Sequence, residues 1–234
     1  MKGNTLRNRF MACALGLFLV APVFGATIEI GSPMGTMVID SSEYGQTTDL
    51  GPDHFRWQGN MSNLDMGWAI DWDLTIDLDP FVTGVSAFTN LMAGTANFTY
   101  NISANSTEAI AFPTVNGAST ISVLDTNGNG ATMAALAGSS IYDAHILAVS
   151  QQSLFDHPFS LVAAPFGVNQ TGTSWGPQAA TGPIGIGDLF GIDHEFSLTG
   201  NDQATINSSF FIVPEPASGL LVLLAAAGLI RRRR

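Results

Sequence analysis

The stretch WAIDWDLTIDL, residues 68–78, decides the fold class of this chain. Large apolar side chains occupy every second position, and small or polar side chains lie between them. Because successive side chains of a β-strand point to opposite faces, this period of two predicts a strand with one buried face. Trp72 should therefore lie in the core, whereas Asp71, Asp73 and Asp77 should share the outer face.

Shorter stretches bounded by turn signals predict further strands. They cover residues 36–40, 82–89, 97–104, 119–124, 144–150, 195–198 and 204–213. Turns are expected at Asn127-Gly128-Asn129-Gly130 and at Thr199-Gly200-Asn201. Between the two ends of the chain, a helix is expected only over residues 132–136, and the Gly- and Pro-rich residues 164–187 are expected to form a long surface loop. Many short strands separated by turns predict an all-β fold, a single β-sandwich of jelly-roll type.

The first 25 residues have the composition of a secretory signal peptide. Three basic residues precede an apolar run at positions 10–20. Val23 and Gly25 are small enough for the positions before a cleavage site, which places the cut before Ala26. Signal peptidase is therefore an expected partner, and residues 1–25 take no part in the expected fold.

The C-terminus combines three physically different parts. Pro214-Glu215-Pro216 is followed by the apolar residues 217–230 and then by Arg231-Arg232-Arg233-Arg234. A helix over residues 217–230 would be about 21 Å long, short of the roughly 30 Å hydrocarbon core, and a bilayer can adapt to this mismatch. The four arginines should stay in the cytoplasm and hold a short transmembrane helix in the inner membrane.

This order of parts resembles the PEP-CTERM sorting signal of Gram-negative bacterial surface proteins. The resemblance implies that an exosortase recognises and cleaves the tail, with Pro214, Glu215, Pro216 and the four arginines as the residues of the signal. The implied domains are a signal peptide over residues 1–25, a β-sandwich ectodomain over residues 26–213 and the sorting signal over residues 214–234. The chain would cross the inner membrane, be anchored there transiently, and reach the cell surface or the medium after processing.

Four short pieces of the ectodomain carry a second resemblance. They are Asp79-Pro80-Phe81-Val82, Asn90, Leu124-Asp125 before Asn127-Gly128, and Phe196-Ser197-Leu198 before Gly200-Asn201-Asp202. Over about residues 68–213 they look like a recurring type of PEP-CTERM ectodomain, an all-β family without an assigned activity. This resemblance implies a fold rather than a function.

Charge is distributed very unevenly along the chain. Residues 26–216 contain all 19 Asp and Glu residues, only one basic residue, Arg56, and no cysteine, so their formal net charge is 1 − 19 = −18. Such a surface repels nucleic-acid phosphates, which excludes a nucleic-acid binder. It attracts cations, and without cysteine no disulfide can stabilise the exported domain.

Asp125, Asn127 and Asn129, followed by Gly130, match the first half of an EF-hand calcium loop. Their side-chain oxygens could converge on Ca²⁺, although the twelfth position of the loop is Leu136 rather than glutamate. The alternative is a simple Asn-Gly turn between strands. The outer face with Asp71, Asp73 and Asp77 is a second place where Ca²⁺ could relieve repulsion, or it is simply a solvated acidic face.

Two further patterns suggest sites on loops. Trp57 and Trp175 lie in loop-like contexts, where they could stack on sugar rings or cover the core. Gly172-Thr173-Ser174-Trp175-Gly176 matches the nucleophile elbow of hydrolases, and Asp188 and His194 follow in the right order. The elbow needs a strand-to-helix turn, which this Gly-rich context does not predict.

Three functions remain open at this point. The first is a non-enzymatic surface or matrix protein that is sorted by exosortase and associated with exopolysaccharide in a biofilm. The second is a carbohydrate-binding module, with or without Ca²⁺. The third is a secreted hydrolase, which only the Ser174 motif supports.

Overall fold

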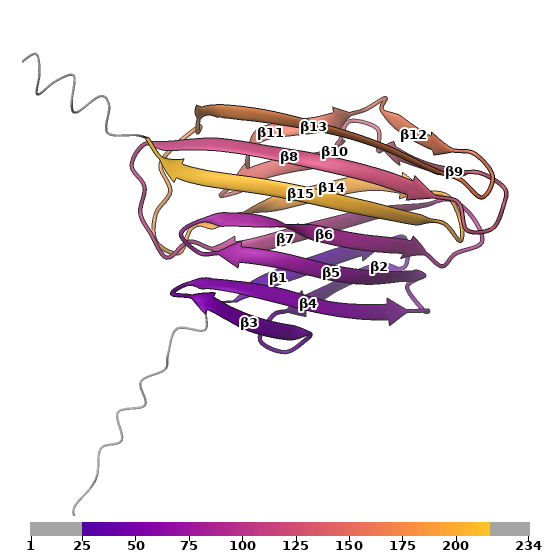
Figure 1. Ribbon diagram of the computed structural model, residues 1–234, viewed down its shortest axis with the longest axis horizontal. Coiled ribbons are helices and arrows are strands. Elements are labelled where there is room, and N and C mark those ends of the chain that lie inside the picture. The colour runs from indigo at the N-terminus through magenta and orange to yellow at the C-terminus, as the bar shows by residue number, and fades with distance from the viewer. Residues whose placement is uncertain (1–24, 216–234) are drawn as a thin grey trace, which may run out of the picture.

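Fifteen strands of residues 25–215, the part of the chain that this computed structural model describes, form two antiparallel sheets that pack face to face (Figure 1). The strands are β1 (Ala26–Ser32), β2 (Gly35–Asp40), β3 (Gln46–Gly51), β4 (His54–Asn63), β5 (Trp68–Asp77), β6 (Phe81–Asn90), β7 (Ala96–Asn105), β8 (Pro113–Leu124), β9 (Ala131–Ala135), β10 (Ser140–Ile146), β11 (Val149–Asp156), β12 (Ser160–Ala163), β13 (Val168–Ala179), β14 (Leu189–Leu198) and β15 (Gln203–Pro214).

The two sheets share the strands almost equally. Sheet A has the order β11-β10-β14-β7-β1-β2, and β9 joins it through β14 and carries β12. Sheet B has the order β13-β8-β15-β6-β5-β4-β3. The strands β3 to β6 form a meander, whereas β8, β13 and β15 each join sheet B after a crossover from sheet A. The expected all-β sandwich is confirmed.

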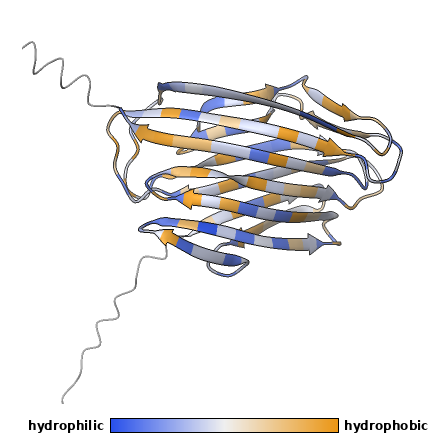
Figure 2. Ribbon diagram, in the orientation of Figure 1, coloured by the Kyte–Doolittle hydropathy of each residue, from blue (hydrophilic) through white to orange (hydrophobic). Residues whose placement is uncertain are grey.

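The expected strand over residues 68–78 is β5, and its faces are as the alternation predicts. Trp68, Ile70 and Trp72 are buried, whereas Asp71 is exposed and Asp73 half-buried on the other side. Hydrophobic and hydrophilic residues also alternate along the central strands of sheet B, such as β15 (Figure 2). One apolar face per sheet is thus available for packing.

Aromatic side chains join the two inner faces. Phe88 of β6 in sheet B lies with its ring centroid 4.6 Å from that of Phe98 on β7 and 5.5 Å from that of Phe196 on β14, both in sheet A. All three side chains are buried. Such tilted and edge-on contacts add to the free energy that burial itself contributes.

Two tryptophans of sheet B form a further aromatic contact in the core. Trp72 meets Trp57 edge-on, with ring centroids 5.5 Å apart. Trp57 donates from Nε1 to the carbonyl of Tyr44 at 2.7 Å. Gly59 makes room for this pair, because a Cβ at that position would lie 2.3 Å from the Trp72 ring.

A buried polar corner closes one end of the sandwich, where β15 begins. Asn90, at the end of β6, donates from Nδ2 to the carbonyls of Leu198 at 2.8 Å and Thr199 at 3.1 Å. The backbone N–H of Asn90 donates to the carbonyl of Asp202, and Asp202 accepts the hydroxyl of Thr199. Pieces of sequence that are far apart in the chain therefore meet at one point and tie sheet B to sheet A.

Three expectations about local structure are wrong. Residues 132–136 are not helical, because most of them form β9, in which Met133 and its small neighbours alternate between the core and the surface. Residues 164–187 contain β13, which pairs with β8 at the edge of sheet B. Most of its side chains are exposed on both faces, so no apolar alternation marks it as a strand. Residues 144–150 span two strands, β10 and β11, joined at Leu147 and Ala148.

The two faces of β5 should respond differently to mutation. Trp72→Ala should cost on the order of 3–5 kcal/mol of unfolding free energy, because it empties a packed aromatic site. Asp73→Asn should cost little. Its carboxylate accepts two N–H donors from Arg56, but this pair is exposed and screened by water. Chemical denaturation of both variants tests this, with Asp71→Asn as the control without that pair. The reverse ranking would mean that the register of β5 is wrong.

Candidate acidic cleft

An acidic cleft opens on the outer face of sheet A, where β14 changes its neighbour. Residues Phe190 to Asp193 of β14 pair with β10, and residues Phe196 to Leu198 pair with β9. Glu195 lies between these two stretches, beside the turn that leads from β9 to β10. A cleft forms here because neither β10 nor β9 pairs with β14 at Glu195.

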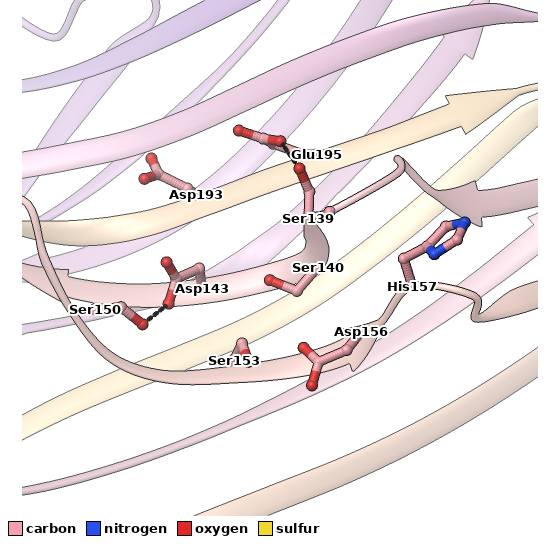
Figure 3. Close-up of a pocket in the computed structure, with 10 residues that line it drawn as sticks. Ser139, Ser140, Asp143, Ser150, Ser153, Asp156, His157, Asp193 and Glu195 are labelled. Atoms are coloured by element: carbon pink, nitrogen blue, oxygen red, sulfur yellow. Dashed lines mark hydrogen bonds between the residues drawn. The ribbon is translucent and has the colours of Figure 1, made fainter.

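Carboxylates and hydroxyls line the cleft (Figure 3). Its volume is about 560 Å³, within the range of roughly 300–1,000 Å³ that is common for ligand sites. The lining residues are Gly138, Ser139, Ser140, Asp143, Ser150, Ser153, Asp156, His157, Asp193 and Glu195.

The strand register explains why the acids gather. Asp143 of β10 lies directly opposite Asp193 of β14, and Ser153 of β11 lies opposite Asp143 on the other side. On its other side, Asp193 lies opposite Asn101 of β7, and Asn101 lies opposite Glu29 of β1. Five adjacent strands thus place three acids in one row across the sheet, and like charges in such pairs repel.

This repulsion and burial change the acidity of the row. Burial raises the pKa of Asp143, although the hydroxyl of Ser150 donates to its carboxylate and works in the other direction. Burial also raises the pKa of Asp193; the nearby His145 opposes this, and the charges of Asp143 and Glu195 raise it further. Folding therefore places negative charge where it is poorly solvated. A nearby positive charge would lower the free-energy cost of this arrangement.

Two buried polar atoms beside Asp193 lack hydrogen-bond partners among the described residues. His145 is 4% exposed, and its Nδ1 lies 3.4 Å from Oδ2 of Asp193 without a hydrogen bond between them. Asn101 donates from Nδ2 to Asp193, but its own Oδ1 is buried without a donor. Gly191 lacks a Cβ, which would lie 2.2 Å from the carbonyl oxygen of Ile102 and 3.1 Å from Cε1 of His145.

The acids of the cleft are spread along strands rather than gathered around one point. Within residues 25–215, no three His, Cys, Asp or Glu side chains are grouped as a metal ion would need. The sequence did not reveal this cleft, because its residues come from separate strands and acquire their proximity only from the register. The single available signal was the large excess of acids in the chain.

The geometry around Asp125 speaks against the expected Ca²⁺ site. The Asp125 carboxylate accepts four backbone N–H groups, from Asn127 at 3.2 Å, Gly128 at 3.0 Å, Gly130 at 3.1 Å and Phe166 at 2.7 Å. Burial opposes the charge, but these donors outweigh it and lower the pKa of Asp125 to about 2. Its two oxygens accept hydrogen bonds from backbone N–H groups, so they stabilise the turn and are not arranged as ligands of a cation.

The other two members of the expected calcium loop also serve the turn. Asn127 donates from Nδ2 to the carbonyl of Gly200 at 2.8 Å, and its Oδ1 accepts the N–H of Asn129 at 3.1 Å. Asn129 itself is exposed. On the face of β5, Asp73 is held by Arg56, so this second expected place for Ca²⁺ already contains a cation.

The two tryptophans expected on loops lie in strands. Trp57 of β4 is 0% exposed, so a glycan-stacking role for it is wrong. Trp175 of β13 is half-buried, with its ring centroid 6.1 Å from that of Phe210 in the core and its Nε1 buried. Both indoles thus contribute packing area to the sandwich.

The residues of the hydrolase pattern have separate structural roles. Ser174 is in the edge strand β13 rather than on a strand-to-helix turn. Asp188 accepts the backbone N–H of Gly185 at 2.6 Å. His194 is buried on the inner face of β14, where its Nδ1 is 2.8 Å from the carbonyl of Ile141. Nothing in this arrangement presents a serine to a base.

The sorting signal lies mostly beyond the described residues. Pro214 is the last residue of β15, and the exposed Glu215 donates its N–H to the carbonyl of Phe112 at 3.0 Å. Pro216, Arg231–Arg234 and the expected signal peptide up to residue 24 lie outside residues 25–215. Among the residues that are described, no helix is long and apolar enough to cross a membrane.

No protein-family model matches the chain, and no curated protein matches its sequence. Among solved structures, a chain of the cryo-EM atomic structure of broad bean stain virus aligns with 81% of this chain and with 81% of its own length, at 9% sequence identity and a TM-score of 0.24. A TM-score this low carries no argument about fold or function.

His194 should make the fold sensitive to acid. Burial lowers its pKa to about 4, below the ordinary 6.5, so the folded state favours the neutral ring. The neutral ring contributes up to about 3 kcal/mol to the unfolding free energy. This contribution is fully present above pH 6.5 and is lost as the pH falls towards 4. His194→Phe should be less stable at neutral pH but should lose less stability between pH 7 and 4.5. Parallel melting curves for both proteins over this range would contradict the assignment.

Asp125 should stabilise the turn without calcium. Asp125→Asn replaces one acceptor oxygen by an NH₂ group that faces N–H donors, so we expect a lower melting temperature. Millimolar CaCl₂ should raise the melting temperature of neither protein more than NaCl of equal ionic strength does. A specific rise with CaCl₂ that the variant lacks would restore the calcium site.

Proposed function

We propose that this protein is a non-enzymatic cell-surface or extracellular-matrix protein that is exported, sorted by an exosortase and associated with exopolysaccharide in a biofilm. Its partners are then signal peptidase, the exosortase, the inner membrane during sorting, and the polysaccharide. Nucleic acid is excluded as a partner by the net charge of −18 over residues 26–216.

The extent of the folded body is the observation that carries this proposal. β1 begins at Ala26, the residue expected to follow the signal-peptide cut, and β15 ends at Pro214, the first residue of the expected sorting signal. Both ends of the sandwich domain lie at the same end of the molecule (Figure 1). Removal of both terminal segments would therefore leave every strand of the sandwich in place.

The contacts of Ala26 suit an amino terminus at this position. Its nitrogen donates to Oγ of Ser41 at 2.9 Å, and its carbonyl accepts the N–H of Ser41 at 3.0 Å. Its side chain is buried. An amino group produced by cleavage before Ala26 would keep this donor role, so the mature N-terminus would stay attached to the sheet.

One face of the sandwich is suited to a hydrated glycan. The four adjacent strands β13, β8, β15 and β6 contain no charged residue. Their outer face carries hydroxyl and amide side chains, such as the cross-strand pair Thr120 and Asn207. This face can approach a polysaccharide without desolvating charge.

The finer form of the fold is also part of the proposal. The repeated crossovers between the two sheets support a sandwich of jelly-roll type. The acidic cleft favours a second candidate function, that of a carbohydrate-binding module, without the calcium that the sequence suggested.

Processing provides the test. Mass spectrometry of the secreted protein should find an N-terminus at or near Ala26 and a C-terminus near Pro216, without the four arginines. Replacing Arg231–Arg234 by neutral residues should impair sorting but leave the ectodomain folded, because they lie outside the sandwich. Arginines retained in the final product, or normal surface display of the neutral variant, would contradict the proposal.

A further inference from the structure

We propose that the edge strand β13 pairs with β13 of a second copy of this chain, in an antiparallel arrangement that joins the two copies of sheet B into one continuous sheet. This inference goes beyond the proposed function, because it concerns how the folded domain associates with itself. Three features of β13 favour such a pair: the direction of its backbone groups, the order of its side chains and its lack of charge.

β13 is an open edge of the sandwich (Figure 1). Edge strands are usually protected from further pairing by charges, by prolines, by bulges or by being short. Of the other edge strands in the described sheets, β2, β3 and β11 each contain an aspartate, and β12 has only four residues. β13 has twelve residues and no charge, and its bulge and Pro177 lie near its C-terminal end. Residues 168–175 therefore lack all of these protections.

The even-numbered residues of β13 direct their backbone groups away from β8. Gly172 lies opposite Thr120, and a Cβ on Gly172 would be 3.4 Å from the Cβ of Thr120. In an antiparallel ladder, side chains lie closer in the pairs that do not exchange backbone hydrogen bonds. The N–H of Gln170 agrees with this, because it donates to Oδ1 of Asn169 at 2.9 Å. The N–H and C=O groups of Gly172 and Ser174 are thus directed at a strand that would add to this edge.

The order of side chains in β13 suits a second copy of the same strand. If two β13 strands run antiparallel about a two-fold axis at Gly172, the outward backbone groups of one strand face those of the other. Gln170 then lies opposite Ser174, and Val168 lies opposite Gly176, so each larger side chain meets a smaller one. Val168 is 67% exposed in the single copy, and the second copy would cover part of it.

Charge restricts where two copies can meet. Residues 26–216 carry a net charge of −18, so most approaches bring like charges together. β13 and its neighbours β8 and β15 contain no charged residue, so contact at this edge costs the least repulsion. A basic partner would instead be attracted to the acidic row of sheet A. Pairing at β13 would also join the uncharged outer faces of the two copies.

Sedimentation velocity of residues 26–215, which contain all fifteen strands and the whole core, measures this association. The fraction of dimer should rise with protein concentration. Added NaCl should strengthen the dimer, because salt screens the repulsion between two acidic copies. A monomer at every concentration, open assemblies larger than a dimer, or a dimer that NaCl weakens would overturn the proposal.

Ser174→Pro tests the backbone pairing. It removes one outward N–H from each copy and should weaken the dimer by about tenfold or more, since two hydrogen bonds are lost. An edge strand tolerates proline where its N–H faces away from the neighbouring strand, so melting curves should show that the domain stays folded. A folded variant that dimerises as well as the original domain would refute pairing through β13.

Two cysteine variants test the register, because residues 26–215 contain no cysteine. Thr171 of one copy would lie opposite Thr173 of the other in a non-hydrogen-bonded pair, with Cα atoms about 4.5 Å apart, within reach of a disulfide. Under mild oxidation, an equimolar mixture of Thr171→Cys and Thr173→Cys should form linked dimers at least about tenfold faster than either variant alone.

The control for the mixture is Asn207→Cys, on the exposed outer face of β15 and away from the edge. Mixed with Thr173→Cys, it should form linked dimers no faster than either variant alone. Equal rates for the Thr171→Cys and Thr173→Cys mixture, for its single variants and for this control would mean random collision and would overturn the proposed pair.

Discussion

Burial of the two inner sheet faces against each other is the interaction on which the rest of this structure depends. Residues 26–215 contain no cysteine and a single basic residue, so neither disulfides nor ion-pair networks can hold the sheets together. Contacts such as those of Phe88 with Phe98 and Phe196 must do so. The few buried acids are tolerated because backbone groups surround them, as the four N–H donors around Asp125 show.

Within the strands, charge is consequently confined to the outer faces, where it is unevenly divided. Sheet B has one uncharged half, made by β13, β8, β15 and β6, and one half with the acids of β5 and Arg56. Sheet A carries three of its acids in one row, namely Asp143 on β10, Asp193 on β14 and Glu29 on β1. Repulsion within this row raises the free energy of the folded state.

The sequence was most informative where one face of a strand is buried. β5 could be predicted from its alternation, and the turn at Asp125 from its Asn and Gly residues. The β10–β11 turn could not, because Leu147 and Ala148 have positive φ angles of 51° and 59° without the Gly or Asn that such turns favour. β13 gave no signal because an edge strand exposed on both faces needs no apolar residues.

The acidic cleft illustrates why a site on strands is harder to predict than a site in one loop. Asp143 and Asp193 become neighbours only through the register of β10 with β14, which depends on packing over the whole sheet. The opening beside Glu195 depends on one further fact, that β14 pairs with β10 and then with β9. A strand that changes its neighbour leaves a position on its edge uncovered, and here that position carries an acid whose carboxylate accepts the hydroxyl of Ser139.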